Sequence, residues 1–422
     1  MTVFEKLQAA ACDCDQSGHS MMSVRDAVQA ALSLAAPVEG TEVLPLAAAR
    51  GRVLALPVTA GADMPRFDNS GMDGYALRHE DLGHDGWIPV AGVSAAGDAT
   101  KDLPAGVAMR IYTGAPLPRG ADTVVMQEKV ERTGDEIRLI APCDQGGNIR
   151  KQGEDRRAGD DLLSIGATLD AKALALCAGA GAGQVTVYRR PRIAMVLTGD
   201  EITPAGEPLT GGAIWDVNGP MLDALCDEAG VEVVETRYVA DTRADMASAL
   251  GDLACHVDMI VTSGGVSVGD RDHVAGALHD IGAKTVVAGV AIKPGKPVTV
   301  ANVDGALVLG LPGNPVSAFV TWHVLGRPLA ARLAGKTGAV DTRWHVRAAT
   351  ALSHKLGRCE YRPARITGYD GDGHQVIACS DHMHSADLGP LAGADGLVLI
   401  PGDVEQLRQG DLLEFLPFKA QS

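Results

Sequence analysis

Between residues 191 and 340, short apolar runs alternate with segments whose apolar residues recur at helical spacing. The runs have the length of buried strands, and the segments between them are long enough for helices. This alternation predicts an α/β fold with a doubly wound, mostly parallel sheet. The expected strands are Arg192–Leu197, Val231–Tyr238, Asp258–Thr262, Thr285–Val290 and Ala306–Leu309, and the expected helices are Met221–Ala229, Asp245–Ala254, His273–Ile281 and Pro315–Leu333.

The pattern changes on both sides of this segment. Ser23 to Leu34 has helical spacing with Ser23 as its N-cap, and an alanine-rich helix is expected over Ala171–Ala178. Between them, short β-like runs separated by Gly and Pro predict a β-rich insertion, with strands at Ile88–Val90, Met109–Tyr112, Thr123–Met126 and Ile137–Ile140. The C-terminal part has short strands with a hairpin signal at Asp370–Gly373, which indicates a small β-barrel.

Five segments are therefore expected along the chain. They are a leader (1–20), a discontinuous mixed domain I (21–55 plus 151–190), a β-rich domain II (56–150), an α/β domain III (191–340) and a β-barrel domain IV (341–422). A length of 422 residues is too large for one core and agrees with three or four folded domains.

Charge and composition narrow the class of partner. The formal net charge is −16, from 37 basic and 53 acidic residues, and such a surface repels nucleic acid and anionic membranes. No apolar window reaches a membrane span, and the N-terminus lacks the pattern of a signal peptide. The eight cysteines are scattered except for Cys12 and Cys14, which is typical of a reduced, cytoplasmic protein.

Acidic and polar loops follow four of the expected strands. Because the carboxyl ends of parallel strands meet at one edge of a sheet, where ligands bind, these loops are expected to form one cleft. Its carboxylates would be Glu201, Asp241, Asp270 and Asp272, and its other candidate ligand-binding residues are Thr198, Gly199, Pro312 and Asn314. Carboxylates gathered in one cleft repel each other unless a cation joins them, and hard oxygen ligands favour Mg²⁺.

The segment from Thr262 to Asp272, TSGGVSVGDRD, is the most distinctive of these loops. Its glycines let backbone amides crowd around an anion, and its serines add hydroxyl donors. The candidate anion ligands are Ser263, Gly264, Gly265 and Ser267. A tight strand-to-helix turn would explain only one or two of the glycines.

A basic counterpart is the stiff segment IKPGKP, in which prolines and a glycine hold Lys293 and Lys296. Both ammonium groups could meet an anion there; the alternative is a solvated surface turn. A second acidic-polar cluster, FDNSGMDGY, includes Asp73 and precedes a strand. Thr113 in TGAP and Asp155 in GED stand in weaker motifs.

Seven strings in this order and spacing resemble the molybdopterin molybdotransferases, the MoeA family, which includes the gephyrin E domain. They are FDNSGMDGYA, TGAPLP, GEDRRAGD, TGDEI, SGGVSVGDRD, IKPGKP and LPGNPVS. The resemblance runs from about residue 21 to the C-terminus. It implies a cytoplasmic homodimer that inserts molybdate into adenylylated molybdopterin, with Mg²⁺ as cofactor and release of AMP. The molybdopterin adenylyltransferase is a further candidate partner.

The resemblance also implies roles for single residues. The positions that match the family's catalytic residues are Asp73, Thr113, Asp155, Glu201, Asp241, Asp272, Lys293 and Lys296. Arg358 in GRCEYR and Ser385 in HSADL match functional positions of the last domain, with His384 where relatives usually have glycine. Mg²⁺ would be held by Glu201 and by Asp241 or Asp272, and molybdate by Lys293, Lys296 or Arg358.

Two other functions remain open on the sequence. The GGVSVGDRD segment alone resembles the molybdopterin adenylyltransferases, although that module lacks the flanking domains expected here. A non-catalytic scaffold of the gephyrin E-domain type is the second alternative, against which the complete set of cleft carboxylates and lysines argues.

Overall fold

The structure is a computed structural model that describes residues 21–83, 86–266, 273–337, 343–380 and 384–418. The chain divides into two compact units. Unit 1 comprises Met1–Glu42, Gly51–Ala55 and Tyr188–Ser422, and unit 2 comprises Val43–Arg50 and Leu56–Val187. The division into four domains stays a prediction.

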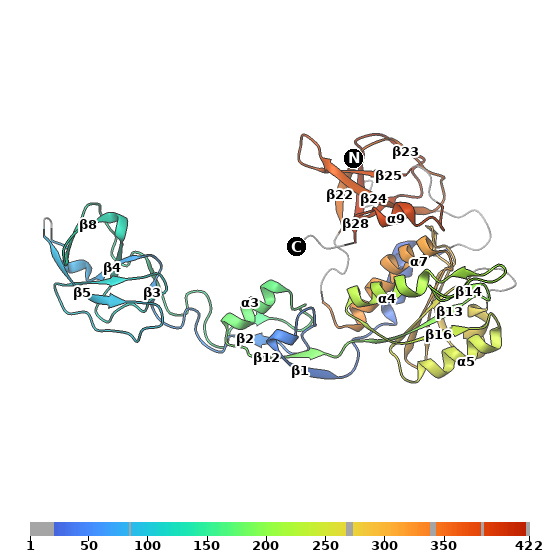
Figure 1. Ribbon diagram of the computed structural model, residues 1–422, viewed down its shortest axis with the longest axis horizontal. Helices are drawn as coiled ribbons and strands as arrows, with labels where there is room; N and C mark the ends of the chain where they lie inside the picture. The colour runs from blue at the N-terminus through green and yellow to red at the C-terminus, as the bar shows by residue number, and fades with distance from the viewer. Residues whose placement is uncertain (1–20, 84–85, 267–272, 338–342, 381–383, 419–422) are drawn as a thin grey trace. The chain divides into compact units, whose positions relative to one another are not determined.

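The central sheet of unit 1 has six strands, and its parallel part is the one expected from the sequence (Figure 1). In spatial order the strands are β16 (Glu232–Val239), β13 (Arg192–Thr198), β17 (Met259–Ser263), β21 (Ala306–Leu311), β20 (Thr299–Val303) and β18 (Lys284–Ala288). The first four run parallel, whereas β20 and β18 are antiparallel to their neighbours.

The antiparallel edge comes from a hairpin turn. Strand β20, which the sequence pattern did not predict, joins β21 through Asp304 and Gly305. Both residues have positive φ, 49° and 99°, as a two-residue type I′ turn requires. The turn reverses the chain, so β20 must lie antiparallel to β21.

Helices cover both faces of the sheet because alternate strand residues point to opposite sides. On β13, Ile193 and Met195 join one core, while Ala194 and Val196 join the other. The first core includes α4 (Asn218–Ala229), α7 (Pro315–Thr321), the π-helical turn Trp322–Gly326 and α8 (Arg327–Leu333). The second includes α5 (Arg243–Ala254) and α6 (Val274–Asp280). This is the expected doubly wound arrangement.

Helix α2 (Val24–Ser33) also belongs to unit 1. Ser23 is its N-cap and accepts a hydrogen bond from the amide of Asp26 at 3.1 Å, as expected. Its buried face, Ala27 and Ala31, packs into the same core as α8.

The C-terminal part of unit 1 is the expected small barrel. Five strands close it through the pairing of β24 with β26: β24 (Cys359–Tyr369), β25 (Gln375–Cys379), β22 (Trp344–Ala348), β28 (Leu412–Pro417) and β26 (Gly396–Ile400). The short strand β19 (Ile292–Lys293) adds to β24 in parallel, so the KPGKP segment starts at the barrel. Further short elements are β23 (Leu352–Ser353), β27 (Gln406–Leu407) and α9 (Gly389–Ala392).

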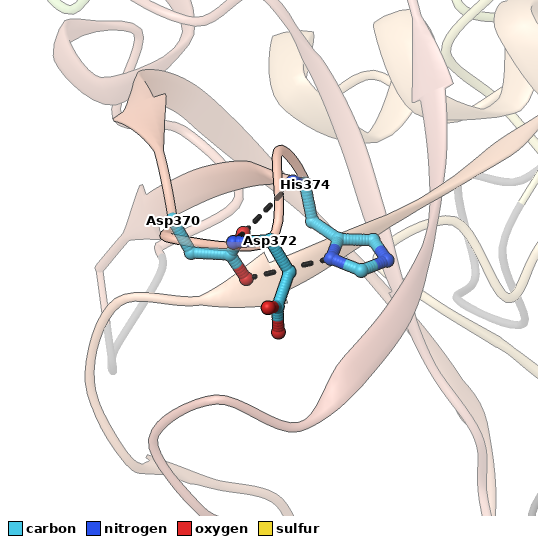
Figure 2. A group of neighbouring side chains, drawn as sticks. All are labelled: Asp370, Asp372 and His374. Carbon is cyan, nitrogen blue, oxygen red and sulfur yellow. Dashed lines mark hydrogen bonds and ion pairs between the residues drawn. The ribbon is translucent and has the colours of Figure 1, made fainter.

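Figure 2 shows the hairpin turn between β24 and β25, where Asp370, Asp372 and His374 gather. The Asp370 carboxylate accepts the amides of Asp372 and His374 at 3.0 and 2.8 Å, and it pairs with Arg347 at 2.7 Å. These contacts satisfy the carboxylate, so hairpin folding explains the cluster without a bound ion.

Unit 2 contains a second six-stranded sheet, as its β-rich texture predicted. Its spatial order is β7 (Thr123–Met126), β4 (Gly74–Leu77), β6 (Ala108–Ile111), β5 (Ile88–Ser94), β9 (Glu136–Leu139) and β8 (Val130–Thr133). Two-stranded sheets accompany it: β1 (Thr41–Pro45) with β12 (Gln184–Tyr188), β2 (Val58–Thr59) with β11 (Asp161–Leu163), and β3 (Asn69–Ser70) with β10 (Ile149–Arg150). Helix α3 (Ala171–Gly179) is the expected alanine-rich helix.

Within the described residues, no helix is both long and apolar enough to cross a membrane.

Candidate functional site

A cleft of about 690 Å³ opens at the carboxyl ends of the parallel strands in unit 1. The strand ends lie side by side, because Ser263 pairs in register with Leu197 on one side and with Leu311 on the other. The cleft is lined by Leu197, Thr198, Gly199, Glu201, Ile202, Ile214, Trp215, Asp216, Val217, Asn218, Asp241, Ser263, Gly264, Gly265, Val266, Pro297, Pro312, Gly313, Asn314, Pro315, Ala386 and Leu388. The strand-end loops predicted to converge therefore do so.

Two of the predicted carboxylates, Glu201 and Asp241, line this cleft. Asp241 accepts a hydrogen bond from the Thr198 hydroxyl at 3.4 Å. Within the described part of the chain, neither carboxylate is paired with a cationic side chain. Carboxylate oxygens are the type of ligand that a divalent cation uses. Asp270, Asp272 and Ser267, which the sequence also assigned to this cleft, lie outside the described residues.

The loop after β17 needs its first glycine. Gly264 has φ of +96°, and a Cβ on it would lie 2.8 Å from the carbonyl oxygen of Thr198. Its amide was expected to face an anion; instead it donates to the carbonyl of Leu311 at 3.1 Å. The residue therefore ties the loop to β21. Of the predicted anion donors that the structure describes, the Ser263 hydroxyl and the Gly265 amide remain.

Asn218, at the start of α4, holds two of the loops together, and sequence reasoning missed it. Its Nδ2 donates to the Ser263 hydroxyl oxygen and to the carbonyl of Gly313, both at 2.7 Å. Because Asn218 supplies a donor to the Ser263 oxygen, the Ser263 proton is free to be donated to an anion. The Oδ1 atom of Asn218 is buried, and no atom of the described residues bonds it.

Asp216 is the second polar residue that sequence reasoning missed. It is buried and accepts hydrogen bonds from the Gly219 amide and the Tyr238 hydroxyl, both at 2.9 Å. Burial, together with this bond to Asp216, raises the pKa of Tyr238 to about 12, so the hydroxyl stays a donor at neutral pH. The signal for both missed residues was the pair of polar residues Asp216 and Asn218 a few positions before the helix expected from Met221.

The lysines of the KPGKP segment differ in their surroundings. Lys293 lies 3.0 Å from Glu360, a carboxylate that is 1% exposed and also accepts a bond from Arg362 at 3.1 Å. Lys296 is exposed, and within the described residues it has no carboxylate partner. Pro297 of the same segment lines the cleft.

Glu360 is a buried acid held in its charged form, and sequence reasoning missed it as well. Burial raises its pKa, but the bonds from Arg362 and Lys293 outweigh this effect and hold the pKa below its ordinary value of 4.5. The neighbouring Arg358 donates to the carbonyl of Ile292 at 3.5 Å, so its side chain also lies against the start of the segment.

The predicted site residue Ser385 makes a hydrogen bond through its backbone carbonyl. Its carbonyl accepts the amide of Val316 at 3.1 Å and so joins this loop of the barrel part to the start of α7. Two of the next three residues, Ala386 and Leu388, line the cleft. Lys293, Lys296, Arg358 and Ser385 are not among the lining residues in the described part of the chain.

Unit 2 carries the other predicted residues. Asp73 accepts both the amide and the hydroxyl of Thr113 at 2.8 Å, and these bonds hold the pKa of Asp73 below its ordinary value. The structure therefore brings these two residues together, as neither motif alone indicated. Asp155 pairs with Arg150 at 2.5 Å.

Comparison with known proteins covers almost the whole chain. Three family models match in order: MoeA N-terminal region (domain I and II) over residues 22–181, probable molybdopterin binding domain over 194–332, and MoeA C-terminal region (domain IV) over 345–418. A Nostoc protein called molybdopterin molybdenumtransferase is 37% identical over 327 residues, which cover 75% of each chain. The chain belongs to the MoeA family.

Other members agree along a greater length. The Mycobacterium tuberculosis protein called molybdopterin molybdenumtransferase 2 is 35% identical over 388 residues, 88% of this chain and 93% of that one. The crystal structure of a MoeA protein of molybdopterin biosynthesis from Pyrococcus horikoshii matches with a TM-score of 0.76 at 30% identity, covering 95% of this chain and all of that one. This MoeA-family protein therefore shares its fold with the Pyrococcus horikoshii protein over almost its whole length.

Proposed function

We propose that this MoeA-family chain is a molybdopterin molybdotransferase, an enzyme of molybdenum cofactor biosynthesis. It inserts molybdate into adenylylated molybdopterin and releases AMP. The observation that carries the proposal is the convergence of Glu201, Asp241, Ser263 and Asn314 on one cleft in a chain whose relatives are named for this transfer. Such a cleft can hold a phosphorylated ligand beside groups that bind a cation.

Mg²⁺ is the cofactor that fits these donors. Glu201 and Asp241 would hold it, since both are oxygen ligands without a cationic partner in the described residues. Bound there, Mg²⁺ would neutralise charge on the phosphoryl group under attack. Ser263 would donate a hydrogen bond from its hydroxyl to a phosphate oxygen, and Asn218, which donates to the same hydroxyl oxygen, leaves that hydrogen available.

Molybdate is a second anion and needs cationic ligands away from the carboxylates. We assign this role to Lys296, because Lys293 already neutralises Glu360. Arg358 is the second candidate, beside the same segment. We also assign catalytic roles in this reaction to Asp73, Thr113 and Asp155, because these residues match catalytic positions of the family.

The setting of the enzyme follows the resemblance. We propose that it works as a homodimer in the cytoplasm and receives its substrate from the molybdopterin adenylyltransferase. The scattered cysteines of the sequence support a reducing compartment. Light scattering tests the dimer, for which a mass of twice 43.6 kDa is expected.

The test is an assay of AMP release from adenylylated molybdopterin at increasing molybdate concentrations. We expect Lys296→Ala to raise the molybdate concentration for half-maximal rate by about tenfold, because a charge-assisted hydrogen bond to the oxyanion is lost. Lys284→Ala, an exposed lysine on β18, is the matched control and should change nothing. Unchanged molybdate dependence in Lys296→Ala would remove that residue from the mechanism.

Two results would replace the proposed function altogether. Consumption of ATP with free molybdopterin would make the protein an adenylyltransferase. Absence of binding to both AMP and molybdate would favour a non-catalytic scaffold.

A further inference from the structure

A group of large apolar side chains lies exposed at the rim of the polar cleft. Ile214, Trp215 and Val217 are 53%, 52% and 38% exposed, and all three line the cleft. Exposure of apolar surface to water is unfavourable, so a cluster of large exposed apolar side chains calls for an explanation. Such clusters at the edge of a cleft are typical of surfaces that contact a ligand.

The Trp215 ring is held in place although it is exposed. Strand β15 (Ile214–Trp215) pairs in parallel with β14 (Ile202–Thr203), which fixes the backbone. The indole Nε1 donates to the carbonyl of Glu207 at 2.9 Å, which fixes the ring. The only polar atom of the indole is therefore satisfied within the protein, and the exposed face of the ring is left to contact apolar, aromatic or cationic groups.

Trp215 lines the same cleft as the Ser263 hydroxyl. Trp215 directly precedes Asp216 and stands three residues before Asn218, whose amide orients the Ser263 hydroxyl. A ligand whose phosphate lies at Ser263 would thus have an aromatic wall available for its flat end within the same cleft.

We propose that Trp215 stacks on the planar nitrogen heterocycle of the phosphorylated ligand. The inference rests on the proposed function, which supplies two such rings, the adenine of the adenylate and the pterin. Stacking would bury the exposed indole face and would select ligands by their flat ring, whereas the strand-end loops select them by their phosphate.

The experiment compares three phosphates on the full-length protein by calorimetry: AMP, a pterin phosphate, and ribose 5-phosphate, which has no aromatic ring. Trp215→Ala should weaken binding of the ligand whose ring stacks by about 5- to 100-fold, the usual effect of losing one aromatic stacking partner. Ribose 5-phosphate affinity should change less than twofold. Trp215→Phe, which keeps a flat ring, should restore most of the lost affinity.

The same affinities show whether Trp215 stacks on adenine or on the pterin. A loss confined to AMP assigns adenine to Trp215, and a loss confined to the pterin phosphate assigns the pterin. Equal affinities of wild type and Trp215→Ala for both would overturn the stacking proposal while leaving the proposed function intact. If the wild type binds none of the three phosphates, the proposed function fails together with it.

Tryptophan fluorescence gives an independent readout. The stacking ligand should quench part of the wild-type emission, and Trp215→Phe should abolish this change. The matched control is Trp87→Phe, which removes another exposed tryptophan, one that packs under Arg138 in unit 2, and should leave the quenching in place. If Trp215→Ala keeps every ligand affinity but lowers the molecular mass in light scattering, Trp215 contacts a second copy of the chain and the stacking proposal is wrong.

Discussion

Removal of the Glu360 carboxylate tests how the barrel and the KPGKP segment are held together. Glu360→Ala removes a buried carboxylate that lies 3.0 Å from Lys293 and 3.1 Å from Arg362, which is itself 3% exposed. Arg362 keeps its bonds to the carbonyls of Ser353 and Ser380, at 2.6 and 3.4 Å. Breaking a buried pair by removing one partner costs about 3–5 kcal/mol.

Thermal unfolding of the full chain measures this loss. Since about 1 kcal/mol moves the midpoint of a domain of 150–250 residues by about 2–4 °C, a fall on the order of 10 °C is expected. The matched control is Glu414→Ala on the same barrel, whose pair with Arg343 at 3.0 Å is about one-third exposed on both sides and is expected to contribute about 0–1 kcal/mol. Equal shifts for the two variants would refute the idea of a charge-balanced Glu360.

The effect should also depend on pH, with a defined sign. The pKa of Glu360 in the folded protein is held below 4.5, its ordinary value. Its contribution is therefore complete above pH 4.5 and is lost as the pH falls through the lower, folded pKa. Accordingly, the difference in midpoint between wild type and Glu360→Gln should be largest near pH 7 and should shrink below about pH 4.5. A difference that stays constant down to pH 3 would contradict the assignment.

Two further predictions concern the cleft itself. Asn218→Ala removes the two 2.7 Å hydrogen bonds to Ser263 and Gly313. AMP affinity measured by calorimetry should fall about tenfold, while the free energy of unfolding should fall by only about 1–3 kcal/mol. Unchanged AMP affinity would show that these two hydrogen bonds do not serve ligand binding. Gly264→Ala places a Cβ 2.8 Å from the Thr198 carbonyl at a φ of +96°, so a loss of about 1–3 kcal/mol is expected in thermal unfolding, whereas the control Gly313→Ala, with its nearest contact at 3.6 Å, should be nearly neutral.

Much of the fold could be predicted because the spacing of apolar residues and the residues that form turns are visible in short stretches of sequence. The apolar runs of β13, β17 and β21 and the helical spacing of α4, α5 and α8 appear directly in the sequence. The antiparallel edge was missed although its signal was present: Asp304-Gly305 between two apolar runs is a hairpin signature. The apolar run after the KPGKP segment is short and shows no clear alternation, so it does not by itself predict β20.

The site was predictable only where strand ends bring residues together. Glu201, Asp241 and Ser263 follow from topology alone, since parallel strands share an edge. The pairing of Lys293 with Glu360 joins residues far apart in the sequence through a parallel strand pair between the α/β part and the barrel, and no local pattern shows it. The orientation of Ser263 by Asn218 likewise depends on side-chain geometry, which periodicity does not contain.

The central claim is that one cleft exchanges adenylate for molybdenum on the same pterin. A single-turnover reaction of the purified protein with adenylylated molybdopterin, Mg²⁺ and molybdate measures this directly, when released AMP and pterin-bound molybdenum are both quantified. We expect equal amounts of the two products, and at least a hundredfold lower rate when Glu201 and Asp241 are replaced by their amides. AMP release without molybdenum on the pterin, or an unchanged rate in the doubly substituted protein, would contradict the claim.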